Sequence, residues 1–179
     1  MERTLAAALL RSLRSVFDTL FQMDVQTGAC ERRRIGRDDD AVRAVVSISG
    51  SSLQAEAALV LPCDTARRIV SLFTADEAAA DSCEMIHDAA AELLTLIVDG
   101  AASHLRTGAF SVGLPRIESD SPEPHAQPGG FDLPRETVDH TWISLPCSCD
   151  LGDFLIEACV RDDVQASAVP DMPCASCFG

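Results

Sequence analysis

The chain has 179 residues, of which 47% are hydrophobic, and its 28 acidic side chains against 14 basic ones give a net charge of −14. This length fits one domain of ordinary size, and the apolar content suffices to bury a core without disulfides or metals. The composition argues against a disordered chain. It also argues against a free-standing nucleic-acid-binding protein, because that class needs a basic face.

Three residue types are missing from the chain, Lys, Asn and Tyr, and the absence of the first two limits its chemistry. All 14 basic residues are Arg, and neither Lys nor Asn occurs. Without Lys, Schiff-base chemistry and a Walker A phosphate loop are excluded, since both require an amine. Without Asn, any chemistry that depends on that side chain is excluded as well.

The first predicted element is an amphipathic helix over residues 3–22. Its apolar residues recur at the spacing of one buried helix face, and they are Leu5, Leu9, Leu13, Val16, Phe17 and Leu20. The segment begins like a signal peptide, but Arg11, Arg14 and Asp18 interrupt the apolar run and no cleavage site follows. We therefore expect a cytoplasmic protein without a membrane partner, whose eight cysteines are reduced thiols.

Strand patterns follow the helix. A strand is plausible within residues 25–35, weakened by Gly28. Residues 41–49 and 53–62 read as a β-hairpin turning at Gly50 and Ser51. The second of these strands alternates apolar and polar positions, which predicts burial of one face only.

Two helices are expected next. Asp64 is a candidate N-cap for a short helix over residues 65–73. Thr74 and Glu77 have the spacing of a capping box that opens the longest helix, about 77–106, ended by Gly108. A further strand is expected around Phe110 to Leu114.

The last third combines a loop, a hairpin and a tail. Residues 118–136 hold four Pro and a Gly pair and predict a flexible loop. Residues 138–146 and 154–161 predict a second hairpin, with Cys147, Cys149 and Gly152 in its turn. We expect one domain over 1–162 and a disordered tail over 163–179. The order of elements indicates an α+β fold, with a mainly antiparallel sheet and two long helices on one face.

The long helix carries a second, polar line of residues. They are Glu84, Asp88, Glu92, Thr95 and Asp99. At spacings of three and four residues they lie along one face, opposite Leu93, Leu94 and Ile97. A solvated helix face is the simplest interpretation of this line, and a functional surface is the alternative.

Several segments, taken in order, resemble the CheX-like branch of the CheC, CheX and FliY chemotaxis phosphatases. They are FDTLFQMDVQTG (17–28), VVSISGSSLQAEAALVLP (45–62), DAAAELLTLIVDGAASHL (88–105), FSVGLPRI (110–117) and TWISLPCSCDLGDFLIEACV (141–160). The resemblance implies a CheX-like fold and two-component or chemotaxis signalling. It also implies a homodimer, because members of this branch pair through their sheets.

The family's motif is an acid or Ser, three residues, Glu, two residues and Asn. Asp88, Glu92 and Thr95 fall on these positions, so Thr95 replaces the Asn. The resemblance implies that this helix faces a phosphorylated response-regulator receiver domain, where the Glu engages a receiver Lys and the Asn orients the attacking water. The chain itself then needs no cofactor, since Mg²⁺ belongs to the receiver. Glu84, Asp88, Glu92 and Asp99 are the expected docking residues.

The sequence is compatible with three functions. The first is a phosphatase of phosphorylated receiver domains whose activity is weak or lost, because a Thr hydroxyl has less reach than an amide. The second is a non-catalytic receiver-binding module of the same fold. The third is a metal-binding scaffold that uses Cys147 and Cys149 with Cys174 and Cys177.

Overall fold

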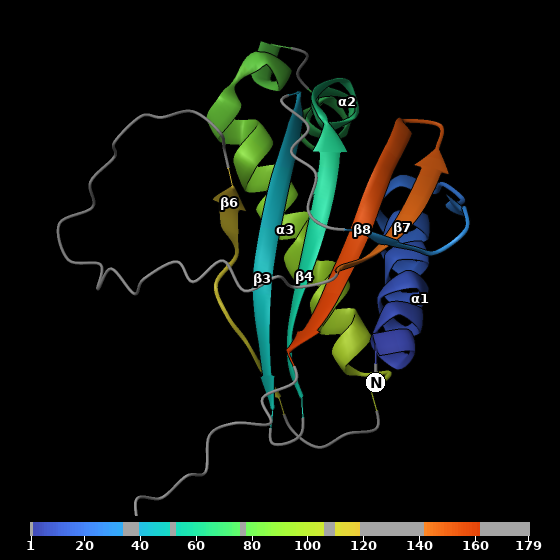
Figure 1. Ribbon diagram of the computed structural model, residues 1–179. Helices are drawn as coiled ribbons and strands as arrows, with labels where there is room; N and C mark the ends of the chain where they lie inside the picture. Colours follow the sequence, from blue (N-terminus) through green and yellow to red (C-terminus); the bar gives the residue numbers. More distant parts are fainter. Residues whose placement is uncertain are drawn as a thin grey trace, which may run out of the picture.

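The computed structural model describes residues 2–33, 40–50, 53–75, 78–105, 110–118 and 142–161. Their fold is an antiparallel sheet with two long helices packed on one side of it, as the sequence predicts (Figure 1). No helix in these ranges is long and apolar enough to cross a membrane. The loop expected at 118–136, except for Glu118, and the tail expected at 163–179 lie outside the described residues.

Within the described ranges the sheet has eight strands, and every pairing between them is antiparallel. The strands are β1 (Gln26–Thr27), β2 (Glu31–Arg33), β3 (Ala41–Gly50), β4 (Gln54–Pro62), β5 (Phe110–Val112), β6 (Arg116–Glu118), β7 (Trp142–Cys149) and β8 (Gly152–Arg161). Their order is β1-β7-β8-β4-β3-β5, with β2 also on β7 and β6 also on β3. Both predicted hairpins, β3–β4 and β7–β8, are confirmed, and they form the centre of the sheet.

The helices are α1 (Glu2–Phe21), α2 (Cys63–Thr74) and α3 (Cys83–Ala102), with a 3₁₀ turn at Ala78–Asp81. Helices α1 and α3 lie on the same side of the sheet (Figure 1). The apolar line of α1 is buried as predicted at Leu5, Leu9, Leu13 and Phe17, whereas Leu20, near its end, is exposed.

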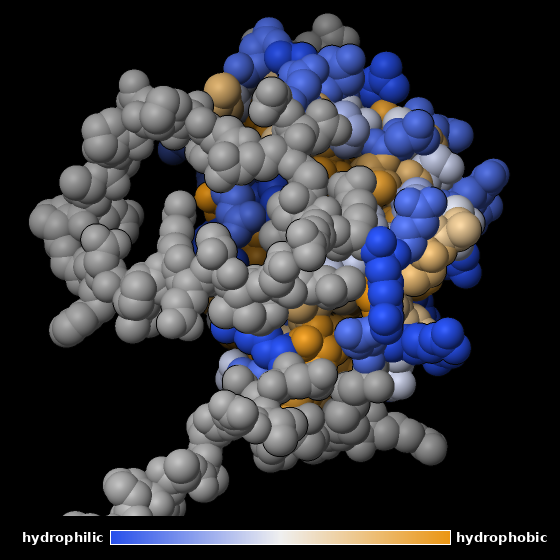
Figure 2. Space-filling model, in the orientation of Figure 1, coloured by the Kyte–Doolittle hydropathy of each residue, from blue (hydrophilic) through white to orange (hydrophobic). Residues whose placement is uncertain are grey.

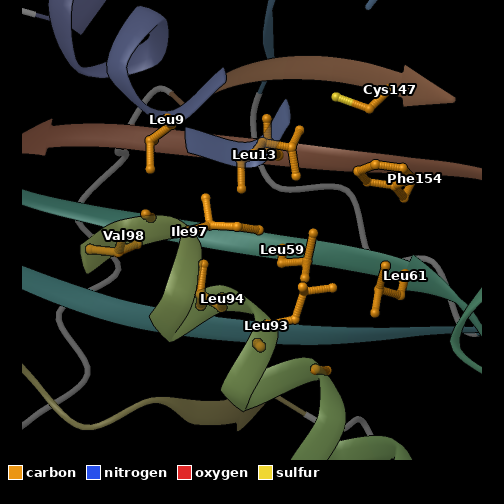
Figure 3. Close-up of a cluster of buried hydrophobic side chains, with 14 of the residues drawn as sticks. Leu9, Leu13, Leu59, Leu61, Leu93, Leu94, Ile97, Val98, Cys147 and Phe154 are labelled. Carbon is orange, nitrogen blue, oxygen red and sulfur yellow. The ribbon is translucent and has the colours of Figure 1, made fainter. Parts of the chain in front are cut away.

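The core lies between these two helices and the sheet. Figure 3 shows Leu9 and Leu13 of α1, Leu93 and Ile97 of α3, and Leu59 of β4 gathered in this layer. All five are fully buried. Burying a leucine side chain stabilises a fold by roughly 1.5–3 kcal/mol, so this cluster strongly fixes which side of α3 faces the sheet.

The second face of the sheet, opposite the helices, holds a smaller apolar cluster of Val45, Ala58, Trp142 and Cys159. Charged side chains surround it. Arg43 on β3 reaches across β4 to pair with Glu157 on β8, and its guanidinium also lies 4.6 Å from the centre of the Trp142 ring. In Figure 2 hydrophilic side chains cover much of the visible described surface, with apolar areas between them.

This network corrects the expectation that β4 is buried on one face only. Glu56, Ala58 and Val60 on the second face are buried as well. Glu56 forms ion pairs with Arg116 at 3.1 Å and with Arg161 at 2.9 Å. Glu56, a polar position in the alternating pattern, is therefore buried in an ion pair and not exposed to solvent, because β6 and β8 supply the opposite charge.

Helix boundaries differ from the sequence predictions. Asp64 does not cap α2, whose N-cap position is Pro62 without a side-chain hydrogen bond. The long helix does not begin at a Thr74–Glu77 capping box, because α2 ends at Thr74 and α3 is capped by Ser82. It ends at Ala102, so Gly108, outside the described residues, is not its terminator.

Some strand boundaries also differ. The plausible strand within 25–35 is two short strands, β1 and β2, and the strand expected at Phe110 to Leu114 ends at Val112. Glu118 belongs to β6 and not to the following loop. Cys147 and Cys149 lie in β7 rather than in the hairpin turn, because both strands of that hairpin extend further than expected.

The two long helices meet closely at Gly100 of α3 and Ser12 of α1. A Cβ atom at Gly100 would lie 2.2 Å from Ser12 Oγ, so the absent side chain is what permits this approach. The Ser12 hydroxyl is buried, and none of the described residues offers it a hydrogen-bond partner. A buried hydroxyl without a partner is unfavourable by about 1–3 kcal/mol.

We predict that Ser12→Ala raises the free energy of unfolding by about 1 kcal/mol, because it removes this unpaired group. Ser15→Ala is the matched control, since Ser15 is exposed on the same helix and reports only the gain in helix propensity. Urea unfolding measures both. A Ser12→Ala protein no more stable than the Ser15→Ala protein contradicts the prediction.

Candidate functional site

The candidate site is the side of α3 that faces away from the sheet. The helix begins at a favourable N-cap, because Ser82 Oγ accepts a hydrogen bond from the Met85 amide at 3.4 Å. Glu84 in the first turn adds a negative charge where the helix dipole favours one. Leu93, Leu94 and Ile97 are fully buried and direct the opposite side outward (Figure 3).

The predicted line of polar residues lies on this outward side. Glu84, Asp88, Glu92 and Asp99, which we call the acidic row, are exposed, and Thr95 among them is half-buried. At a rise of about 1.5 Å per residue, the row extends over roughly 22 Å. The structure thus brings every predicted docking and motif residue onto one continuous helix face.

The negative charge of the acidic row is not compensated by any ion pair within the described part of the chain. Helix α3 contains no Arg, and among the described residues none of its four carboxylates forms an ion pair. By contrast, Arg43, Arg116 and Arg161 pair with carboxylates on the second face of the sheet. The acidic row can therefore attract a cationic group from outside the chain.

Thr95 uses its hydroxyl group within the helix. Its Oγ1 donates a hydrogen bond to the Ala91 carbonyl at 2.8 Å. The hydroxyl oxygen can still accept a hydrogen bond, but its one proton is engaged. An amide side chain at this position, by contrast, reaches further and donates and accepts with separate atoms.

The cysteines are not arranged as a metal centre in the part of the chain that the structure describes, where no group of three or more potential ligands is close enough to hold an ion. Cys147 points into the core (Figure 3), and its thiol donates to the Leu145 carbonyl at 3.4 Å. Burial raises the pKa of Cys147 to about 11. Cys174 and Cys177, the other half of the predicted metal site, lie outside the described residues.

Two features of the structure, one at the site and one on the second face of the sheet, were not anticipated from the sequence. Met85 and Leu96 are exposed on α3 beside the acidic row. Their positions fall outside the predicted core face, so helical periodicity alone could have identified them. The stacking of Arg43 on Trp142 joins residues that are distant in sequence, so only the sheet register reveals it.

No protein-family model and no curated protein matches the sequence. Solved structures do match the fold. A CheC-like superfamily protein from Shewanella sp. PV-4 aligns with a TM-score of 0.70 and 18% identity, over 90% of this chain and 99% of that one. The chemotaxis protein CheX from Desulfovibrio desulfuricans aligns with a TM-score of 0.64 and 17% identity, over 88% and 99%.

A third match is the CheX–CheY–BeF3–Mg²⁺ complex from Borrelia burgdorferi, with a TM-score of 0.64 and 16% identity, over 88% of this chain and 96% of that chain. The described residues therefore have the fold of CheC-like and CheX proteins. The resemblance inferred from the sequence is confirmed at the level of the fold.

We predict that Cys147 reacts about 100-fold more slowly with a thiol reagent at pH 8 than a thiol of pKa 9.0, because its pKa of about 11 reduces the thiolate fraction by that factor. Exposed Cys83 is the internal reference. Peptide mass spectrometry after timed labelling measures both rates, and labelling in urea should make them similar. Equal rates in the folded protein contradict this account of Cys147.

Proposed function

We propose that the protein acts in chemotaxis or two-component signalling by binding a phosphorylated response-regulator receiver domain through the outward side of α3. The observation that carries the proposal is the acidic row, exposed and without an ion-pair partner among the described residues, on a CheX-like fold. The Borrelia burgdorferi CheX was solved with CheY, BeF3 and Mg²⁺. A fold alone does not determine function, so the proposal depends on this site.

Glu92 is the proposed anchor of the receiver. In the family that the chain resembles, this position engages a Lys of the receiver, and a charge-assisted hydrogen bond gives the contact both strength and direction. Asp88 lies one turn earlier and adds negative potential. Any Mg²⁺ would belong to the receiver, and we propose that the protein meets this partner in the cytoplasm.

Hydrolysis is proposed to be weak or absent. An aspartyl phosphate is an acyl phosphate, a mixed anhydride whose carboxylate is a good leaving group, so a phosphatase needs mainly to hold a water in line with the P–O bond that breaks. Thr95 takes the position of the water-orienting amide, but its short hydroxyl donates to the Ala91 carbonyl. We therefore favour a receiver-binding protein with a lapsed catalytic site over an efficient phosphatase.

A homodimer is part of the same proposal, carried by the resemblance. The described outer strands, β1, β2, β5 and β6, are two or three residues long. Short edge strands offer few backbone groups for pairing with a second sheet. We therefore expect a dimer to use more of the surface than the strand edges, and the mass measured by light scattering tests whether a dimer forms.

We predict that Glu92→Arg abolishes binding of the receiver, because it places a positive charge against the receiver's Lys. The free energy of unfolding should change by no more than about 0.5 kcal/mol, since the side chain is exposed. Isothermal titration calorimetry with receiver domains from the same genome, activated with beryllofluoride and Mg²⁺, measures the affinity. Asp150→Arg, an exposed charge reversal in the β7–β8 turn, is the control. If the Glu92→Arg variant binds the receiver with unchanged affinity, the outward side of α3 is not the docking surface.

We predict that Thr95→Asn accelerates the decay of a phosphorylated receiver, whereas the wild type accelerates it little or not at all. The new amide extends past the helix backbone and orients a water, while docking residues stay unchanged. Release of inorganic phosphate over time measures the rate, and Thr95→Ala is the control for loss of the hydroxyl. If the wild type is already as fast as Thr95→Asn, the catalytic site has not lapsed.

A further inference from the structure

Two of the six large apolar side chains that are exposed in the described part of the chain lie on α3. They are Met85, 37% exposed, and Leu96, 39% exposed. A single exposed apolar side chain is normal in soluble proteins and needs no explanation. A functional interpretation therefore depends on where Met85 and Leu96 lie relative to each other and to the acidic row.

Met85 and Leu96 share one edge of the helix. They are eleven residues apart, which is about three turns, and half-buried Ala89 lies between them on the same side. We call Met85, Ala89 and Leu96 the apolar flank. Met85 is next to Asp88, and Leu96 is next to Glu92 and Asp99, at the three- and four-residue spacings of neighbouring helix positions. The apolar flank therefore runs beside the acidic row for most of its length.

The packing of α3 fixes the side on which the flank lies. Gly100, one turn after Leu96, contacts Ser12 of α1. The apolar flank consequently lies between the acidic row and α1, on the outward surface of the helix layer. Together they form a two-part surface, with an apolar line on one side and an unpaired negative line on the other.

We propose that Met85 and Leu96 are specificity-determining contact residues for the receiver, whose docking surface offers an apolar patch bordered by Lys or Arg side chains. This inference rests on the proposed function and adds to it the chemistry that selects the partner. The charge of the surface indicates the charge of its partner. Its four carboxylates have no ion-pair partner among the described residues, so the surface attracts a cationic partner and repels an acidic one. Apolar side chains, Met among them, are typical of interface centres, and charges of their rims.

The two parts of this surface should act on different rate constants. Charges at an interface rim mainly raise the association rate and its sensitivity to salt, whereas buried apolar contacts mainly slow dissociation. Neutralising Glu84 and Asp99 should thus lower the association rate. Removing the side chains of Met85 and Leu96 should raise the dissociation rate with little change in salt dependence.

The test compares Met85→Ser/Leu96→Ser with the wild type by surface plasmon resonance, using the beryllofluoride-activated receiver that binds in calorimetry. We expect the dissociation constant to rise about 10-fold or more, through faster dissociation. Leu114→Ser is the matched control, because Leu114 is 93% exposed in the β5–β6 connection, and it should bind as the wild type does. Circular dichroism checks that each variant is folded.

The outcomes separate the inference from the proposed function. If the double variant binds as tightly as the wild type while Glu92→Arg does not bind, the acidic row docks the receiver and the apolar contact is overturned. If Leu114→Ser weakens binding equally, the effect is not specific to α3 and the inference fails. If no activated receiver from the same genome binds the wild type, the proposed function fails and the inference fails with it.

Discussion

The packing of Leu93, Leu94 and Ile97 against the sheet is the constraint on which the rest of the site depends. Because these side chains and those of α1 fill one layer with the sheet, α3 cannot rotate about its axis without exposing several leucines. The opposite side of the helix is consequently fixed toward solvent. The acidic row faces solvent because the buried side chains beneath it hold α3 in one orientation. A docking surface on such a rigid helix loses little conformational entropy when a partner binds.

The two faces of the sheet use charge in opposite ways. On the second face, Arg43, Arg116 and Arg161 pair with Glu157, Glu118 and Glu56, so the charges there are balanced within the chain. On α3 the carboxylates are exposed and find no described Arg. Buried ion pairs contribute weakly to stability but are very unfavourable to break. The second face is therefore suited to holding strands in register, and the outward side of α3 to recognition.

How much the sequence predicts depends on whether the signal is local. The face of α3 follows from periodicity alone, so Glu84 to Asp99 were placed correctly opposite Leu93 and Ile97. The hairpins follow from alternation and turn residues. Burial of Glu56 could not be predicted, because it depends on Arg116 and Arg161 from distant strands. The start of α3 does not follow from the sequence, because both Ser82 and the Thr74–Glu77 pattern are possible N-caps. In the structure α2 extends to Thr74, and Ser82 caps α3. The exposure of Met85 and Leu96 follows from the same periodicity, because both positions lie outside the core face of α3.

If an activated receiver docks on the outward side of α3, the residues that contact it can be mapped one by one along the helix. The measurement is a titration of ¹⁵N-labelled protein with the receiver, beryllofluoride and Mg²⁺, followed by amide chemical shifts. We expect the shifts to concentrate in Cys83–Ala102, above all around Glu92, with smaller changes in neighbouring α1. Shifts concentrated on β3, β4 and β8, or none at saturating receiver, would contradict this expectation.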